Sequence, residues 1–196
     1  MPEPILSSRF ETALAFAARL HRNQLRNDTA IPYVSHLLGA ASLALEHGAD
    51  EDEAIAALLH DAVEDQGGTS TLETIRLLFG DKVAEVVRAC SDNDGDGEKL
   101  PWKQRKVAYL EHLQHATAST RLVSASDKLH NAHSILSDLR QDGEGVWSRF
   151  SSSKPEILWY YRSLAAEFRT GIPKGLADEL AAVVTEMERL AGEHGS

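Results

Sequence analysis

Helix start and stop signals divide almost the whole sequence into helix-length segments, and this pattern restricts the fold more than any other feature. Capping-box patterns, in which Ser or Asp is followed three residues later by Glu, begin segments at Ser8, Asp50 and Ser70. No run of strand type, with alternating apolar and polar residues, interrupts the series. Helices are predicted at residues 8–23, 34–47, 50–65, 70–80, 81–90, 102–116 and 119–139, at a short turn near 146–150, and from Pro155 and Pro173 onward. We therefore expect an all-α fold of about nine or ten helices.

The length of 196 residues suits a single domain. A chain of this size buries roughly 70% of its unfolded surface, so it needs no covalent or metal staple to fold. Its one cysteine, Cys90, excludes an internal disulfide and fits a reducing compartment. The sequence has no apolar run long enough to span a membrane, and its first ten residues lack the features of a signal peptide. We expect a cytoplasmic protein without a membrane segment.

Acidic residues outnumber basic ones by 30 to 20, and they are concentrated in one part of the chain. Residues 44–98 contain 15 acidic and three basic residues. The short stretch that follows has four basic residues and no acidic one: Lys99, Lys103, Arg105 and Lys106. Because nucleic-acid binding needs a broad basic face that displaces counterions, we expect no nucleic-acid partner. We interpret the basic strip as a site for a small anion.

A His60-Asp61 doublet followed by Glu64-Asp65 comes directly after the apolar run AIAALL. Residues four apart on a helix share a face, so these side chains are predicted to form one polar patch. An imidazole and three carboxylates beside a hydrophobic core are costly to bury unless another charge compensates them. A divalent cation would compensate them; the alternative is a solvated acidic helix end.

Two further residues complete a set of metal ligands. His36 opens the second predicted helix, and Asp127 interrupts the apolar periodicity of RLVSASDKLHNAHSIL. Taken singly, His36 would be interpreted as a helix cap and Asp127 as an ion-paired side chain. With the His-Asp doublet they form a site of two nitrogen and two oxygen donors. This mixture suits Mn²⁺, Fe²⁺, Co²⁺ or Zn²⁺ better than Ca²⁺.

Three sequence blocks resemble the HD superfamily of metal-dependent phosphohydrolases: His36, LLHDAVED at 58–65 and DKLHN at 127–131. The chain is most similar to the hydrolase half of the RelA/SpoT alarmone enzymes and to the free-standing small alarmone hydrolases, over residues 10–168. The resemblance implies an HD-type domain at residues 8–170, with residues 171–196 as its C-terminal helix and tail. It also implies removal of the 3′-pyrophosphate of guanosine tetra- and pentaphosphate, with one Mn²⁺ as cofactor.

Carried over residue by residue, the resemblance gives four metal ligands: His36, His60, Asp61 and Asp127. The Glu-Asp pair that orients and activates the attacking water falls on Glu64 and Asp65. The hydrolase region nearly fills the chain, so we expect degradation as its only activity, without a synthetase domain. A homo-oligomer is left open.

On the substrate side, the resemblance implies contacts to the base, ribose and phosphates from Arg26, Lys103, Arg105, Lys106, Asn131 and Tyr161. Tyr160 competes with Tyr161 for its role. The family's Arg-Lys pair is Arg26-Asn27 here, and its His-Pro pair is His36-Leu37. Because Asn27 replaces the family's lysine, we expect guanosine specificity to be affected more than hydrolysis.

Other substrates and another class of protein are alternatives to this function. The substrate could be a 3′-pyrophosphorylated adenosine nucleotide or NADPH, or the chain could be a catalytically silent nucleotide sensor. The sequence contains neither a P-loop nor a dinucleotide-binding glycine motif.

The segment from Asp92 begins like a calcium-binding loop, but Lys103 occupies the position that needs a glutamate. We therefore interpret this segment as a polar loop over the mouth of the site. His130 and His133 are interpreted as hydrogen-bonded helix residues rather than spare ligands.

Overall fold

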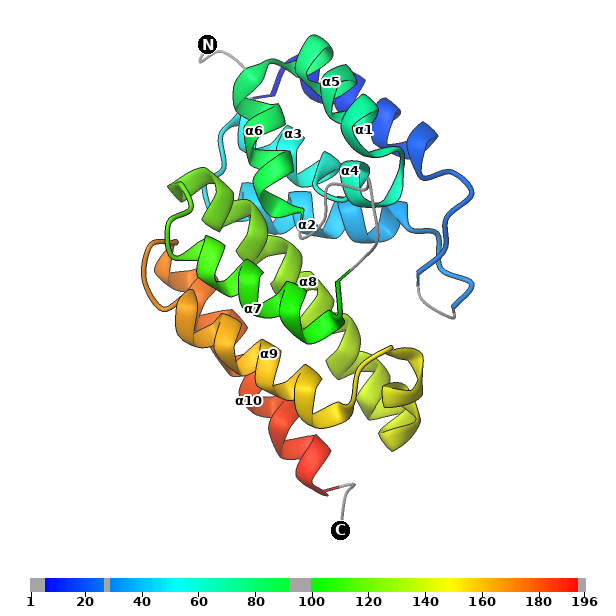
Figure 1. The fold of residues 1–196 in the computed structure, drawn as a ribbon, viewed down its shortest axis with the longest axis vertical. Coiled ribbons are helices and arrows are strands. Elements are labelled where there is room, and N and C mark those ends of the chain that lie inside the picture. Colours follow the sequence, from blue (N-terminus) through cyan, green and yellow to red (C-terminus); the bar gives the residue numbers. More distant parts are fainter. Residues whose placement is uncertain (1–5, 27–28, 92–99, 194–196) are drawn as a thin grey trace.

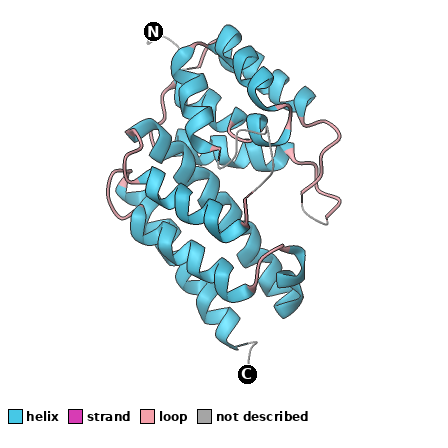
Figure 2. Cartoon of the chain, in the orientation of Figure 1, coloured by secondary structure: helices cyan, strands magenta, loops and turns pink. Residues whose placement is uncertain are grey.

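A computed structural model describes residues 6–26, 29–91 and 100–193. Within these ranges the chain is helical, and its one β-type feature is an isolated bridge between Leu25 and Pro32 (Figure 2). The helices are α1 Ser8–Leu20, α2 Val34–Glu46, α3 Glu51–Leu59, α4 Ala62–Asp65, α5 Gly68–Phe79, α6 Asp81–Cys90, α7 Trp102–Leu113, α8 Ala118–Asp142, the 3-10 helix η1 Gly143–Arg149, α9 Lys154–Glu167 and α10 Lys174–Glu193. The predicted all-α, single-domain fold is confirmed. The predictions for Asn27, Lys99 and the loop from Asp92 concern positions outside the described residues.

The longest helix, α8, runs through the middle of the molecule. Helices α1 to α6 lie toward one end of the molecule, and α7, α9 and α10 toward the other (Figure 1). Helix α8 packs against α2, α3, α6, η1 and α10, and its residues 120–127 are all buried. A helix segment enclosed on every side has no solvent face on which to place a charge. A charged side chain in this segment therefore needs partners within the protein.

Helix α3 is equally enclosed, because residues 54–59 are all buried. The sequence predicts one helix over residues 50–65, but α3 ends at Leu59 and α4 begins at Ala62. Asp61, with φ −93° and ψ −2°, stays in the right-handed helical region but deviates by about 30–40° from ideal helix angles, and it precedes α4. Adjacent residues of a regular helix point in different directions. The interruption allows His60 and Asp61 to direct their side chains to the same point, where His60 Nε2 lies 3.0 Å from Asp61 Oδ2.

The predicted helix caps are confirmed in part. Asp50 and Glu53 form the expected capping box of α3. The cap of α1 is Ser7 rather than Ser8. Helix α5 begins at Gly68 rather than after Ser70, because Gly67 adopts the left-handed conformation (φ 115°) and turns the chain into the helix earlier.

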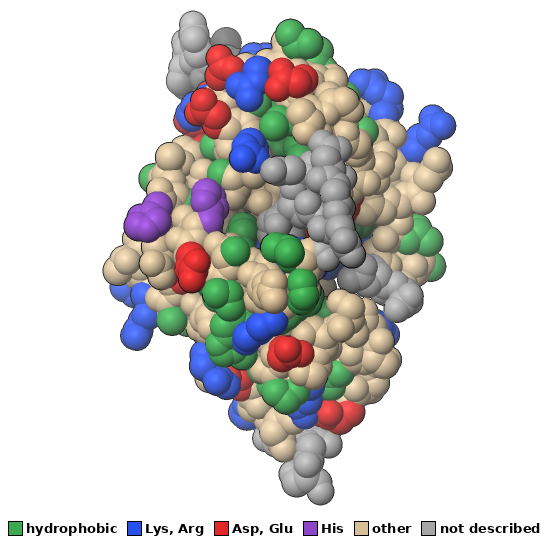
Figure 3. Space-filling model, viewed as in Figure 1, with side chains coloured by type: hydrophobic (Ala, Val, Ile, Leu, Met, Phe, Trp, Pro, Cys, Tyr) green, Lys and Arg blue, Asp and Glu red, His purple; other side chains and the backbone are tan. Residues whose placement is uncertain are grey.

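Part of the negative charge of residues 44–98 lies in ion pairs on the surface. Where α1, α3 and α6 meet, Arg9 pairs with Glu51 and Asp52, and Lys82 pairs with Asp50. Basic and acidic side chains alternate over this end of the molecule (Figure 3). Such exposed pairs are worth little individually, about 0–1 kcal/mol. These three carboxylates therefore have basic partners within the chain.

Arg121, near the start of α8, ties together the ends of α7 and α9. Its guanidinium donates to the carbonyl of Leu113, to the carbonyl and carboxylate of Glu167, and to the carbonyl of Thr170, over 2.6–2.9 Å. These bonds satisfy carbonyl groups at two helix ends that have no partner within their own helices. The buried Arg121 thus fixes α9 against α8.

Replacing Arg121 by Met is expected to lower the free energy of unfolding by about 2–4 kcal/mol, because the half-buried carboxylate of Glu167 and the carbonyls of Glu167 and Thr170 lose a charged donor. Chemical denaturation monitored by circular dichroism measures the change. Arg140→Met is the matched control on the same helix, since Arg140 pairs with Glu186 on the exposed surface. That control is expected to cost less than about 1 kcal/mol. Equal losses in the two variants would contradict this account of Arg121.

Candidate metal centre and cavity

Four side chains from three parts of the chain converge at one buried point. His36 comes from the first turn of α2, His60 and Asp61 from the turn between α3 and α4, and Asp127 from the enclosed part of α8. The two Nε2 atoms of the histidines are 3.2 Å apart. His36 Nε2 lies 3.4 Å from Asp61 Oδ2 and 3.2 Å from Asp127 Oδ1; the corresponding distances from His60 Nε2 are 3.0 and 3.4 Å. The structure therefore brings together all four residues predicted as ligands.

The donor set fits a divalent ion. Atoms bound about 2.1 Å from one ion lie about 3.0 Å apart in octahedral and about 3.4 Å apart in tetrahedral geometry. The observed separations of 3.0–3.4 Å fall in this range. His36, His60 and Asp127 each offer one ligand atom within 4.8 Å of the others, and Asp61 contacts both imidazoles. The observed positions support a site for a divalent metal ion with nitrogen and oxygen ligands.

Both imidazoles are oriented so that their Nε2 atoms face the site. His60 Nδ1 lies 2.8 Å from the carbonyl oxygen of Ala57 and donates to it. His36 Nδ1 lies 2.9 Å from Nδ1 of His130. Burial, together with His36 and Arg26, lowers the pKa of His130 to about 4, so its ring is neutral at neutral pH. Metal-binding histidines commonly use their second nitrogen in this way.

Each carboxylate also has partners outside the cluster. The hydroxyl of Tyr33 donates to Asp61 Oδ2 at 2.6 Å. Lys128 Nζ lies 2.6 Å from Asp127 Oδ2, and Asn131 Nδ2 donates to Asp127 Oδ1 at 2.6 Å. These contacts hold the carboxylates in fixed directions on α8 and at the α3–α4 turn.

The electrostatics of the cluster favour positive charge. Burial alone would raise the pKa values of Asp61 and Asp127, but His60 beside both carboxylates, and Lys128 beside Asp127, hold these pKa values well below the usual range. Burial would lower the pKa of His60, but the two carboxylates raise it well above its ordinary value. The same ionised carboxylates that favour a proton on His60 would attract a divalent cation.

Glu64 and Asp65 lie beside the cluster on α4, and both line the same cavity. Gln24 Nε2 donates to Asp65 Oδ2 at 2.8 Å. The amide oxygen of Gln24 accepts from His21 Nδ1 at 2.7 Å and from Gln66 Nε2 at 2.6 Å, which fixes the amide with its nitrogen toward Asp65. Arg105 approaches Glu64 at 4.0 Å. The two neighbouring carboxylates therefore have different surroundings.

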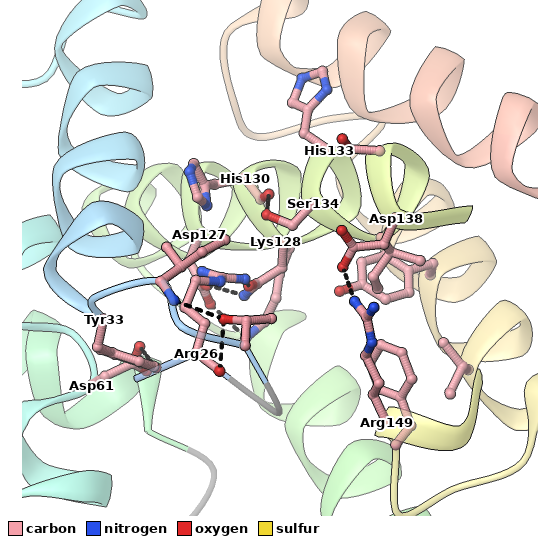
Figure 4. Close-up of a pocket in the computed structure, with 18 of the residues that line it drawn as sticks. Arg26, Tyr33, Asp61, Asp127, Lys128, His130, His133, Ser134, Asp138 and Arg149 are labelled. Atoms are coloured by element: carbon pink, nitrogen blue, oxygen red, sulfur yellow. Dashed lines mark hydrogen bonds and ion pairs between the residues drawn. The ribbon is translucent and has the colours of Figure 1, made fainter. Parts of the chain in front are cut away.

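The cavity has a volume of about 620 Å³ and extends along α8 from Asp61 and Asp127 to Asp138. Figure 4 shows Tyr33 and Asp61 at one end and the ion pair of Arg149 with Asp138, 2.8 Å, at the other. Asp138 lies eleven residues after Asp127 on the helix, a rise of about 16 Å. The cavity is therefore long enough for an extended ligand whose two ends have different chemistry.

The predicted substrate-binding residues occupy different positions. Arg26, Lys106, Asn131, Tyr160 and Tyr161 line the cavity. Arg26 donates to Asn131 Oδ1 at 2.9 Å, while its Nη1 is buried without a hydrogen-bond partner among the described residues. The residues of the basic strip diverge: Lys106 faces the cavity, Arg105 approaches Glu64, and Lys103 lies over the ring of Trp159 rather than in the cavity lining.

Sequence reasoning missed four residues that support the site: Gln24, Tyr33, Lys128 and Arg149. Lys128 follows Asp127 directly, and Tyr33 is three residues before His36, so proximity to the ligands was a usable signal for both. Gln24 and Arg149 had no such signal, because their contacts to Asp65 and Asp138 span 41 and 11 residues. The interpretation of His130 as a hydrogen-bonded helix residue is confirmed.

A helical domain in which a His-Asp doublet, a further histidine and a distant aspartate surround one point has the architecture of an HD domain. Consistent with this, the family model described as "HD domain" matches residues 13–155. The chain is 38% identical over 139 residues to the guanosine-3′,5′-bis(diphosphate) 3′-pyrophosphohydrolase MESH1 of Xenopus tropicalis, covering 69% of this chain and 72% of that protein. It is 32% identical over 183 residues to the protein of the same name from Danio rerio, covering 92% and 91%.

A solved structure titled "A metazoan ortholog of SpoT hydrolyzes ppGpp and plays a role in starvation responses" superposes with a TM-score of 0.75 at 27% identity, covering 93% of this chain and 96% of that one. The chain therefore belongs to the HD-domain family and, within it, to the group that contains the MESH1 proteins. None of the helices that the structure describes is long and apolar enough to cross a membrane.

Titrating the metal-stripped protein with Mn²⁺ or Zn²⁺ is expected to raise its melting temperature. An ion that binds only the folded state stabilises it by about 2.7 kcal/mol when the free ion concentration is 100 times Kd. Asp61→Ala removes one of two carboxylates and should abolish most of this shift. Asp138→Ala, at the other end of the cavity, should leave it intact. A wild-type metal response in Asp61→Ala would contradict the assignment of Asp61 as a ligand.

Proposed function

We propose that this chain is a 3′-pyrophosphohydrolase of guanosine tetra- and pentaphosphate that depends on one Mn²⁺. The observation that carries the proposal is the position of a two-imidazole, two-carboxylate cluster at one end of a cavity that also contains Glu64 and Asp65. The similarity to the Xenopus tropicalis and Danio rerio guanosine-3′,5′-bis(diphosphate) 3′-pyrophosphohydrolases supports this substrate. The products would be pyrophosphate and GDP or GTP.

The reaction needs an activated water next to a phosphorus atom. A divalent ion held by the four ligands would lower the pKa of water and polarise a phosphoryl oxygen. Asp65, held by Gln24, and Glu64, beside Arg105, would orient the water and accept its proton. Asp65 has the more fixed direction, because the amide that holds it is itself bonded on its other side.

Cationic side chains around the ion site would bind the phosphates. Lys106 and Lys128 line the cavity, and the buried Arg26 Nη1 offers a hydrogen bond that no described residue accepts. Donors of this kind neutralise charge that develops on a departing pyrophosphate. Tyr160 and Tyr161 both line the cavity, and the hydroxyl of Tyr160 is likewise buried without a partner among the described residues, so either tyrosine can contact the ligand.

The rest of the cavity would hold the nucleoside. Asn131 donates to Asp127 and accepts from Arg26, and its amide has a second hydrogen that can reach a ribose hydroxyl. Beyond it the lining combines polar and apolar side chains: Ser134, Ser137, Phe150 and Ile157. A nucleotide with its 3′-pyrophosphate at the ion would extend in this direction along α8.

A turnover assay with Mn²⁺ tests the proposal directly. The purified protein is incubated with guanosine tetraphosphate, its adenosine counterpart, ATP, dGTP and NADPH, and products are identified by chromatography and phosphorus NMR. We expect GDP and pyrophosphate from guanosine tetraphosphate, with activity lost on chelation and restored by Mn²⁺. Absence of turnover, or preference for another of these nucleotides, would overturn the proposed substrate.

Neutral substitutions at the two carboxylates separate catalysis from metal binding. Glu64→Gln and Asp65→Asn are expected to lower kcat by about 10²–10⁴ while leaving bound metal unchanged, because acid–base and positioning groups contribute on this scale. Metal analysis and steady-state kinetics on the same samples provide the comparison. Glu73→Gln, an exposed change on α5, is the control and should retain full activity. If kcat is unchanged at both positions, the role assigned to this pair is wrong.

A further inference from the structure

The hydrogen bond between two histidine rings sets the state of a metal ligand. His36 Nε2 faces His60 and Asp127, so it must carry a lone pair to bind a metal ion. Its proton then resides on Nδ1, which lies 2.9 Å from Nδ1 of His130. His130 can accept that hydrogen bond only through a lone pair on its own Nδ1. The two rings thus fix one tautomer each.

A glycine in the middle of α2 makes this contact possible. Gly39 lies three residues after His36, on the same face of the helix. A Cβ atom at position 39 would lie 2.0 Å from Cδ2 and 2.2 Å from Nε2 of His130, far inside van der Waals contact. Glycine is unfavourable within a helix, yet here its missing side chain leaves the space that the imidazole occupies. Figure 4 shows His130 projecting from α8 toward α2.

We propose that His130 is a positioning residue that fixes the tautomer and direction of His36, and that Gly39 is required because it leaves room for His130. The inference rests on the proposed function, since it assumes that His36 binds the ion. His130 acts through His36: its Nδ1 is directed at His36, and its ring lies outside the group of three residues whose ligand atoms converge.

The affinity for Mn²⁺ alone, measured from the electron paramagnetic resonance signal of the free ion, tests the proposal without substrate. His130→Phe keeps a ring but removes the acceptor, and it should weaken Mn²⁺ binding by about 10–100-fold, the usual effect of losing such a partner. His130→Asn places an oxygen near the position of Nδ1 and should recover most of the affinity. His133→Phe, the same change on the exposed side of α8, should bind Mn²⁺ like the wild type.

The variant Gly39→Ala provides a second, independent test of the proposal. In the wild-type background it should weaken Mn²⁺ binding, although Ala is the better helix former. In the His130→Ala background the ring is absent, so Gly39→Ala should cost no further affinity and should raise the melting temperature. This non-additivity is expected only if Gly39 acts through His130. It decides the question even if His130→Phe does not fold.

Three results would overturn the proposal. His130→Phe and Gly39→Ala could bind Mn²⁺ as the wild type does, Asn could rescue no better than Phe, or Gly39→Ala could weaken binding equally in both backgrounds. In each case the wild-type protein still binds Mn²⁺, and the proposed function stands. A wild-type protein that binds no Mn²⁺ would instead overturn the proposed function and the inference together.

Discussion

The structure depends on placing four ionisable side chains at one point inside a hydrophobic core. Removing carboxylates from water costs several kcal/mol per ion unless opposite charge and hydrogen bonds compensate it. Here the compensation comes from every side: Tyr33 on Asp61, Lys128 and Asn131 on Asp127, and the Ala57 carbonyl on His60. A bound divalent ion would complete this balance at the centre.

Several irregularities of the fold follow from the same requirement. The break between α3 and α4 directs His60 and Asp61 to one point, which a continuous helix would not do. Two side chains of the α1–α2 connection fix carboxylates at the site: Tyr33 donates to Asp61, and Gln24 donates to Asp65. Arg121 holds the end of α9 to α8, and α9 contributes Tyr160 and Tyr161 to the lining of the cavity.

The sequence was sufficient to predict the class of fold and to select four side chains that the structure brings together at one point. Helix start and stop signals predicted most of the helices. The ionisable residues His60, Asp61 and Asp127 within or beside apolar runs indicated the candidate metal site, because such residues are seldom buried without a specific partner. It was insufficient where the answer depends on contacts between distant segments. Nothing near position 24 indicates that Gln24 holds Asp65, and the basic strip gave no sign that Lys106 faces the cavity while Lys103 packs on Trp159. The helix break at Asp61 was missed because spacing alone cannot show a change of helix direction.

A crystal structure of the Mn²⁺-loaded protein, with anomalous diffraction recorded at the manganese edge, tests the central claim most directly. We expect one anomalous peak about 2.0–2.3 Å from His36 Nε2, His60 Nε2 and one oxygen each of Asp61 and Asp127. A strong peak elsewhere, with none among these four side chains, would contradict it.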